Sequence, residues 1–575
     1  MKRPVIILTP LLLAVTSLAL VSKNFDHRSV SSYSTRSSPV IGCAPDAGET
    51  FYADDNGNFI TILPGWGDHA YSITTENDSA QVYFNQGLTM YYGYHPREAI
   101  ASFKQAAKFD STCAMAYWGE ALAMGPTYNG GYSYKMNKGV PAAIELMDHN
   151  AANCTEKEKD LISAMKARYN LADTADTERK RLNKDYVEVL RPLVAKYPAD
   201  LDVKALFVDA VMLVHPWDFW NTDGTPKSWT PELVQCCKDI LAKDPHHPAA
   251  LHYYIHVTEA SRTPEVALPS ADSLKKLFPG IAHMVHMSSH EYERIGYYAQ
   301  GVEVNDEADE SLGRYASLAQ GLNLTLHSSH YYAVYTYCAL SGGMYKRSIE
   351  KGMALRNLVH PNYENTNDQY LYMFPLLAMV RMGKWQDIIA DNSSISSDWK
   401  YAGVLDDFAK GMAYAKTGNV AKAETFVHDL REKQKDSVLR ARFIPHVSSP
   451  YPCSVIAENI LVANIAFRNK KYNEAFTAIN NAIISEDSLV YAEPNSWMLP
   501  ARQYLGAFLL KLNKPAQAEK VYREDLVRNP GNGWSLLGLY QSLQAQEKTA
   551  ELEKLKALFT NSFSQADSFP STSAY

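Results

Sequence analysis

Residues 503–540 read QYLGAFLLKLNKPAQAEKVYREDLVRNPGNGWSLLGLY, and a pattern recurs within this stretch. A Leu-Gly pair returns after 32 residues, with a small residue, an aromatic residue and a proline between the two copies. Small residues let neighbouring helices approach closely, whereas proline ends a helix. The stretch therefore predicts stacked helix pairs. The positions are Leu505-Gly506, Ala518, Tyr522, Pro530 and Leu537-Gly538.

The same arrangement occurs near the start of the helical part of the chain. Gly87 and Gly119 are 32 residues apart and flank Ala99, Phe103 and Ala106, and a weaker copy includes Tyr414 and Ala423. This pattern resembles the tetratricopeptide repeat (TPR), a helix pair of about 34 residues. The resemblance extends over most of 80–559 and is weakest in the middle, where insertions containing proline lengthen the period. It implies an all-α, right-handed TPR-type α-solenoid with irregular insertions.

Four strings are similar to those of an uncharacterised group of exported bacterial TPR proteins. That resemblance implies the fold and carries no chemistry. The strings lie at 84–88 (FNQGL), 117–122 (YWGEAL), 491–494 (YAEP) and 529–536 (NPGNGWSL).

Composition excludes several classes of protein. The 575 residues carry a net charge of −7, so there is no basic surface that would predict nucleic-acid binding. Seven cysteines in a chain of this length do not make a disulfide framework. An apolar fraction of 46% is that of a globular chain and not of a disordered one.

The N-terminus predicts export. Lys2 and Arg3 precede an apolar run over 5–21, which is typical of a signal peptide, with an uncleaved anchor as the alternative. We therefore expect a periplasmic or extracellular protein with no later membrane span. The expected parts are a signal peptide or anchor (1–22), an irregular lead-in (23–78), a TPR array with a histidine-rich groove (79–355), a second TPR array (356–565) and a tail (566–575).

Histidine is concentrated in one part of the chain. Nine of the 17 histidines lie within 246–330, although imidazole is polar and costly to bury without a partner. If 34-residue units begin at Val214, Pro248 and Ala282, the motif His-x-x-x-His-x-x-Glu occupies the same positions in two successive units. First helices of TPR pairs line the concave groove, so the resemblance implies two parallel rows of side chains facing that groove.

These rows predict a metal site. Imidazoles one helical turn apart can bind one ion, and nearby carboxylates can bind it or orient the imidazoles. So many nitrogen ligands predict two ions with about three imidazoles each. Copper is the first expectation, and zinc or iron comes next. The predicted ligands are His252, His256, Glu259, His283, His286, His290, Glu293 and His330, with His215 and His327 at the two ends.

Two hypotheses about function follow, and whether the chain is an enzyme stays open. In the first, the concave face holds the metal centre of an oxidoreductase, and the aromatic patch at 217–220 walls a small-molecule pocket. In the second, the chain is a non-catalytic scaffold of the cell envelope that binds a protein or peptide in its groove. The sequence has no Gly-rich phosphate loop and no nucleophile elbow, so it assigns no catalytic residue.

Overall fold

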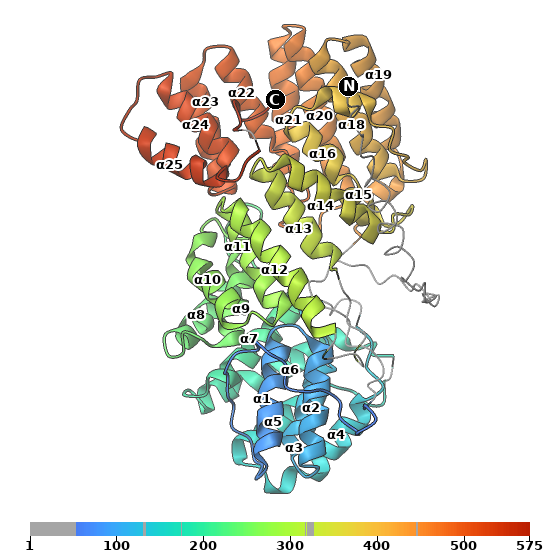
Figure 1. The fold of residues 1–575 in the computed structure, drawn as a ribbon, viewed down its shortest axis with the longest axis vertical. Helices are drawn as coiled ribbons and strands as arrows, with labels where there is room; N and C mark the ends of the chain where they lie inside the picture. The colour runs from blue at the N-terminus through green and yellow to red at the C-terminus, as the bar shows by residue number, and fades with distance from the viewer. Residues whose placement is uncertain are drawn as a thin grey trace, which may run out of the picture. The chain divides into compact units, whose positions relative to one another are not determined.

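The structure, a computed structural model, describes residues 53–129, 134–173, 175–316, 318, 322, 327–443, 447–567 and 569–575. The predicted signal peptide or anchor and the first part of the lead-in lie outside these ranges. The described residues form α-helices joined by turns and short 3-10 segments, and none of them forms a β-strand. Figure 1 shows the helices in chain order from blue α1 to red α25.

The first part of the chain forms helices that pack mainly against their neighbours in sequence. They are α1 (Asp78–Tyr92), α2 (Pro96–Phe109), α3 (Ala114–Ala123), α4 (Val140–His149), α5 (Glu156–Ala167), α6 (Arg179–Lys196), α7 (Leu201–Val214), α8 (Thr230–Leu241), α9 (Pro248–Thr258), α10 (Leu268–Leu277), α11 (Ala282–Arg294), α12 (Tyr298–Ala316), α13 (Ser329–Ser341) and α14 (Tyr345–Leu358).

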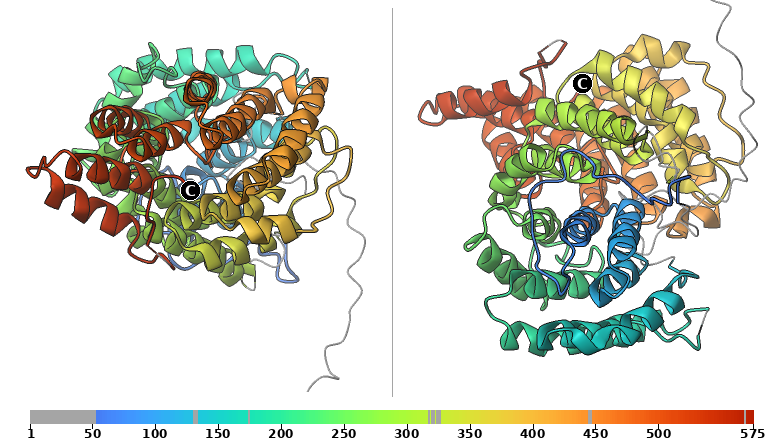
Figure 2. Two further views of the ribbon diagram at one scale, coloured as in Figure 1. Left: turned by 90° about the horizontal axis from the view of Figure 1, so that it is seen from above. Right: turned by 60° about the horizontal axis from the view of Figure 1, so that its bottom comes forward.

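The second part continues the same pairing, with α18 on α19, α20 on α21 and α24 on α25. The further views in Figure 2 show these helices side by side. They are α15 (Thr366–Tyr372), α16 (Phe374–Arg381), α17 (Trp385–Ala390), α18 (Lys400–Thr417), α19 (Val420–Lys433), α20 (Pro450–Arg468), α21 (Tyr472–Asp487), α22 (Ala501–Lys511), α23 (Pro515–Arg528), α24 (Gly533–Gln544) and α25 (Leu552–Ser562).

Glycines of the repeat pattern are the points of closest helix packing. The ring of Phe103 on α2 lies between Gly87 on α1 and Gly119 on α3, where an added Cβ would approach the ring to 2.8 Å and 2.3 Å. Tyr522 on α23 lies in the same way between Gly506 on α22 and Gly538 on α24, with distances of 2.3 Å and 2.2 Å. Real Cβ atoms do not come so close, and therefore only glycine fits. The 32-residue spacing of these glycines thus has a steric cause.

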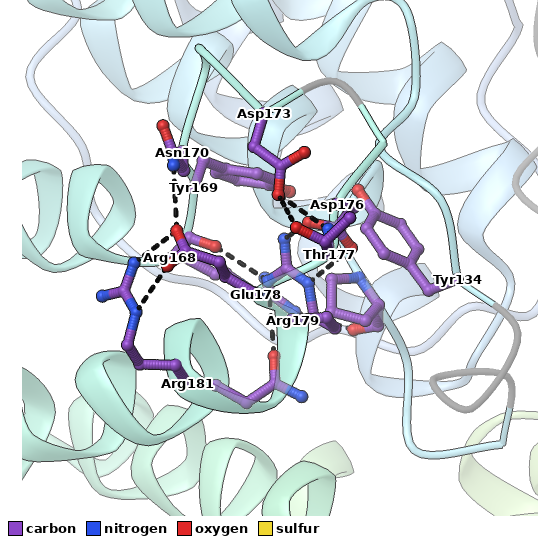
Figure 3. Close-up of polar contacts among 12 residues, drawn as sticks. Tyr134, Arg168, Tyr169, Asn170, Asp173, Asp176, Thr177, Glu178, Arg179 and Arg181 are labelled. Carbon is purple, nitrogen blue, oxygen red and sulfur yellow. Dashed lines mark hydrogen bonds and ion pairs between the residues drawn. The ribbon is translucent and has the colours of Figure 1, made fainter.

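An insertion between α5 and α6 is held by arginine side chains (Figure 3). Arg179 donates from Nε and Nη2 to both carboxylate oxygens of Asp176, at 2.8 Å and 2.7 Å. It also donates from Nη1 to the carbonyl of Arg168 at 2.8 Å, and its guanidinium lies over the rings of Tyr134 and Tyr169. Bidentate pairing of this kind neutralises a buried arginine.

The end of the chain packs back onto the last repeats. The Ser573 hydroxyl lies 2.6 Å from the Tyr522 hydroxyl and donates to the carbonyl of Gln503 at 2.9 Å. Residues predicted as a tail thus belong to the packed structure as far as they are described. Within the described ranges, no helix combines the length and the apolar character needed to cross a membrane.

Candidate metal centre

The histidine-rich motifs lie on three helices that pack together. Helix α11 contacts both α9 and α13. Helix α9 begins at Pro248, which suits the first helical position, and α13 begins after Ser328, whose side chain caps it. These residues fix where each helix begins. Six histidines then point inward, and between 0% and 5% of each is exposed: His252, His256, His283, His286, His290 and His330.

The first group of nitrogen ligands joins α9 to the start of α11. One ring nitrogen from each of His252, His256 and His283 lies within 4.8 Å of the other two. The closest pair is Nε2 of His252 and Nε2 of His283, at 2.9 Å. The rings of Tyr94 and Tyr128 cover this group, with centroids 4.6 Å from His252 and 4.8 Å from His256.

The second group joins α11 to α13. Ring nitrogens of His286, His290 and His330 also lie within 4.8 Å of one another, and the Nε2 atoms of His286 and His290 are 2.9 Å apart. Because His283 and His286 are neighbours on one face of α11, their ring centroids are only 6.1 Å apart. The two groups of three imidazoles are therefore adjacent.

Hydrogen bonds on the outer side of the rings set their orientation. His252 Nδ1 donates to the carbonyl of Tyr92 at 2.6 Å, because a carbonyl can only accept. His286 Nδ1 lies 2.7 Å from Oδ1 of Asn305, whose Nδ2 donates to the carbonyl of Gly301. His256 Nδ1 lies 3.0 Å from Oε1 of Glu259. The Tyr92 carbonyl and the Asn305 amide oxygen only accept, so they fix the tautomers of His252 and His286 and direct Nε2 toward the centre, as around metal-binding histidines.

In both groups, Nε2 atoms of neighbouring rings face each other. A neutral imidazole that donates from Nδ1 has only an acceptor at Nε2. His252 and His286 are in this state, yet each Nε2 lies 2.9 Å from the Nε2 of another histidine. Each contact requires an N–H on the facing ring or a metal ion, and His283 can supply the N–H because its Nδ1 has no hydrogen-bond partner among the described residues. In addition, Nε2 of His256 and of His330 is buried without a hydrogen-bond partner among the described residues.

Burial sets the protonation state of the rings. It lowers the pKa of His252 and of His330 to about 3, so both imidazoles are neutral at pH 7. Burial, together with the charges of neighbouring imidazoles, also lowers the pKa of His256, His283 and His286. Neutral imidazole is the form that binds transition metals.

A carboxylate from a distant part of the chain completes the surroundings. Glu493 lies between α21 and α22, and its Oε2 is 2.8 Å from Nδ1 of His290, while Oε2 of Glu259 is 4.0 Å from the same nitrogen. Burial and the Glu493 charge raise the pKa of Glu259, whereas His290 holds that of Glu493 low. Sequence analysis missed Glu493, although it lies in the string YAEP, which the family resemblance included.

Four predicted ligands lie outside both groups, Glu259 beside the second group and three others. His215 follows the end of α7 and stacks on Trp229 with 3.6 Å between ring centroids. The expected unit start at Val214 is wrong, because α7 ends there and Pro216 follows. His327 precedes α13. Its side chain is 57% exposed and pairs with Asp309. Glu293 is buried near Glu493, and its carboxyl oxygens have no hydrogen-bond partner among the described residues.

The histidines are enclosed and do not face an open groove. The expectation of rows displayed on a concave face is therefore corrected. Helix α1 contacts α9, and the Tyr92 carbonyl and the Tyr94 ring reach the first group from the end of α1. The segment that carries Glu493 reaches His290 of the second group.

A third cluster lies apart from the six histidines. Asp202 on α7 accepts from Nε2 of His69 at 2.9 Å, and Nε2 of His247 lies 3.6 Å from the same oxygen. The Tyr92 hydroxyl donates to this oxygen as well, at 2.8 Å. The shared carboxylate accounts for this cluster as a structural contact between α1, α7 and the start of α9.

Comparisons with known proteins concern the fold alone. No family model matches the chain, and no curated protein matches its sequence. Among solved structures, a human IFIT1 dimer with m7Gppp-AAAA has 11% identity and a TM-score of 0.30, covering 85% of this chain and 91% of that one. Yeast Tom70 has 10% identity and a TM-score of 0.27, with 84% and 92% covered. The helix pairs and their glycine–aromatic contacts define this chain as a TPR-type α-solenoid.

Proposed function

We propose that this α-solenoid binds two transition-metal ions in the enclosed histidine centre and serves as a metal-dependent oxidoreductase. The observation that supports the proposal most directly is the pair of adjacent three-imidazole groups, with rings oriented by outer hydrogen bonds. Helical cores do not need this arrangement, because buried imidazole without a partner is destabilising. Metal ions would satisfy the nitrogens that face each other at 2.9 Å.

Copper is the metal that we propose first. Imidazole suits copper, zinc and iron, and copper(II) binds most tightly among the divalent ions of the first row. Di-iron sites in helical proteins use mainly carboxylates, whereas here six imidazoles face two nearby carboxyl groups. Three imidazoles per ion leave a position for an external ligand, as catalytic sites require. The proposed export from the cytoplasm agrees with a centre that takes its metal outside it.

Elemental analysis of the full-length protein tests the proposal. We expect about two copper ions per chain, on the ground of three nitrogen ligands each. A variant with both His256→Ala and His290→Ala should lose both ions, because each substitution removes a ligand from one group. The matched control is His428→Ala, since that side chain is 74% exposed. Copper-free protein that also fails to bind added copper, zinc or iron(II) would refute the proposal.

The alternative is a scaffold that binds a protein or peptide partner, and the repeat fold is compatible with it. Because the six histidines are enclosed, a peptide on the surface of the solenoid would not contact them. The two functions therefore separate experimentally. Partner binding that is the same in wild type and in the double-histidine variant, in protein without metal, would favour the scaffold alone.

A further inference from the structure

A second site lies beside the histidine centre. A cavity of about 470 Å³ is bounded by the chain after α7, the ends of α11, α21 and α23, and the segment that leads to Glu493. Trp217, Trp220, Tyr491 and Trp497 contribute aromatic surface to it. The aromatic patch at 217–220 was expected to wall a small-molecule pocket, and Trp217, Asp218 and Trp220 of this patch line the cavity.

Arginine side chains dominate the polar lining. The guanidinium groups of Arg262 and Arg294 both reach the carbonyl oxygen of Arg528, each with Nη1 at 3.5 Å. Their other hydrogen bonds also go to carbonyl oxygens: Arg262 donates to Thr222 at 2.6 Å, and Arg294 donates to Glu259 at 2.9 Å and to Ser261 at 3.1 Å. Two positive groups thus converge on one neutral acceptor.

Carboxylates line the cavity as well, but none pairs directly with Arg262 or Arg294 among the described residues. Among the described residues, no carboxylate oxygen lies within 4.0 Å of either guanidinium, although Arg294 is only 7% exposed. Asp487 is already shared, because it pairs with Arg502 at 2.7 Å and with Arg528 at 2.9 Å. Burial raises the pKa of the neighbouring Glu486 to about 8, so its carboxyl is mainly neutral at pH 7. Arg179, by comparison, is also a buried arginine but pairs directly with the carboxylate of Asp176.

We propose that this cavity binds an anionic small molecule with an aromatic or otherwise flat apolar part. Arg262 and Arg294 would hold its carboxylate or phosphate, since guanidinium groups bind either anion through two parallel hydrogen bonds. The tryptophan and tyrosine rings would pack against the apolar part. The anion would supply the direct charged partner that neither guanidinium has among the described residues, and buried charges are otherwise paired.

The cavity also adjoins the proposed metal centre. Tyr491 lines the cavity two residues before Glu493, and Arg294 lies one turn after His290 on α11. The Arg294 guanidinium lies 5.5 Å from the centroid of the Tyr491 ring. The idea that the bound anion is the substrate of the metal centre rests on the proposed function. The binding of an anion in the cavity does not depend on that function.

Calorimetric titration of the full-length protein with benzoate, phenyl phosphate and neutral benzamide tests this inference. We expect one of the two anions to bind at least about tenfold more tightly than benzamide, given the energy of hydrogen bonds to charged groups. The stronger of the two identifies the anion as carboxylate or phosphate. Arg262→Gln should weaken that binding about tenfold or more. Arg523→Gln, an exposed arginine on the same helix as Arg528, should leave it unchanged.

Several outcomes would overturn the inference. They are equal binding of benzamide and both anions, no binding of any probe, or unchanged anion binding in Arg262→Gln. Each of these results would mean that Arg262 and Arg294 serve only to hydrogen-bond backbone carbonyls and do not bind an anion. Arg294→Gln is a second variant, and Arg262→Gln is the safer of the two because that side chain is half-buried. Titrations with and without copper separate this inference from the metal proposal: anion binding without any metal uptake would support the cavity and refute the centre.

Discussion

Single residues on the outer side of the imidazoles decide how well the centre can hold a metal. Glu493 is the clearest case, because its carboxylate lies 2.8 Å from the nitrogen of His290 that faces away from the second group. Such a carboxylate makes the imidazole a stronger ligand and fixes its orientation.

Glu493→Gln should therefore weaken copper binding by about 10- to 100-fold while all six histidines remain. The amide keeps the shape of the side chain but removes the negative charge that His290 contacts. Competition with a chelator of known affinity measures the change. Glu474→Gln on α21, whose side chain is 63% exposed, is the control. Equal affinities in wild type and Glu493→Gln would show that Glu493 has no part in the site.

The sequence predicted the ligands, which lie on regular helices, and missed Glu493, the outer partner of His290 that lies outside them. His252, His256 and Glu259 follow a helical spacing that recurs after 34 residues, so their common face could be worked out. Glu493 reaches His290 across about 200 residues, from a segment without periodicity, and no local pattern encodes such a contact. The assumed 34-residue units also misplaced His215, because α7 ends at Val214 and His215 lies after the end of that helix.

Helix pairs are the elements of this fold, and substitution of their glycines tests whether close helix packing requires glycine. Gly119→Ala would place a Cβ 2.3 Å from the Phe103 ring, so α3 or the ring must shift. We expect a loss of about 1–3 kcal/mol in the free energy of unfolding, as for overpacked cores. Gly313→Ala on α12 is the control, because no heavy atom lies within 4 Å of its Cβ position, and alanine favours the helix. Urea unfolding followed by circular dichroism compares them, and equal loss in both variants would contradict the steric argument.

The α18–α19 pair carries a buried ionisable contact. Asp407 on α18 accepts from the Lys433 ammonium on α19 at 2.5 Å, and burial raises the pKa of Asp407 to about 6. In the unfolded chain this pKa is near 3.8. The folded state therefore binds the proton more tightly, and the stability that this supplies is lost as pH rises through 6.

Wild type should thus lose about 2–3 kcal/mol of stability between pH 4 and pH 7 relative to Asp407→Asn, which has no proton to release. Urea-unfolding midpoints of the two proteins at both pH values give the difference. Asp148→Asn is the control, because its ion pair with Lys166 is exposed and its removal should not alter the pH dependence. A pH dependence that is the same in wild type and Asp407→Asn would remove Asp407 as its source.

At the scale of the whole molecule, the proposed centre joins parts of the chain that the repeats alone would keep separate. In a repeat array each unit mainly contacts its neighbours, and stability is local. Here the six histidines come from α9, α11 and α13, while Glu493 comes from the segment before α22. Metal binding should therefore stabilise distant segments together, because a ligand that binds only the folded state adds its binding energy to stability.

We expect removal of copper by a chelator to increase amide hydrogen exchange in α9, α11, α13 and the segment at 490–497. Exchange in α18 and α19 should stay the same, because no proposed ligand lies there. Mass spectrometry of proteolytic fragments resolves these segments within one sample. The double variant His256→Ala, His290→Ala, treated identically, should show no response to the chelator. If α18 and α19 change as much as α11, the metal stabilises the fold as a whole, and the link between the repeats and residues 490–497 through the centre is refuted.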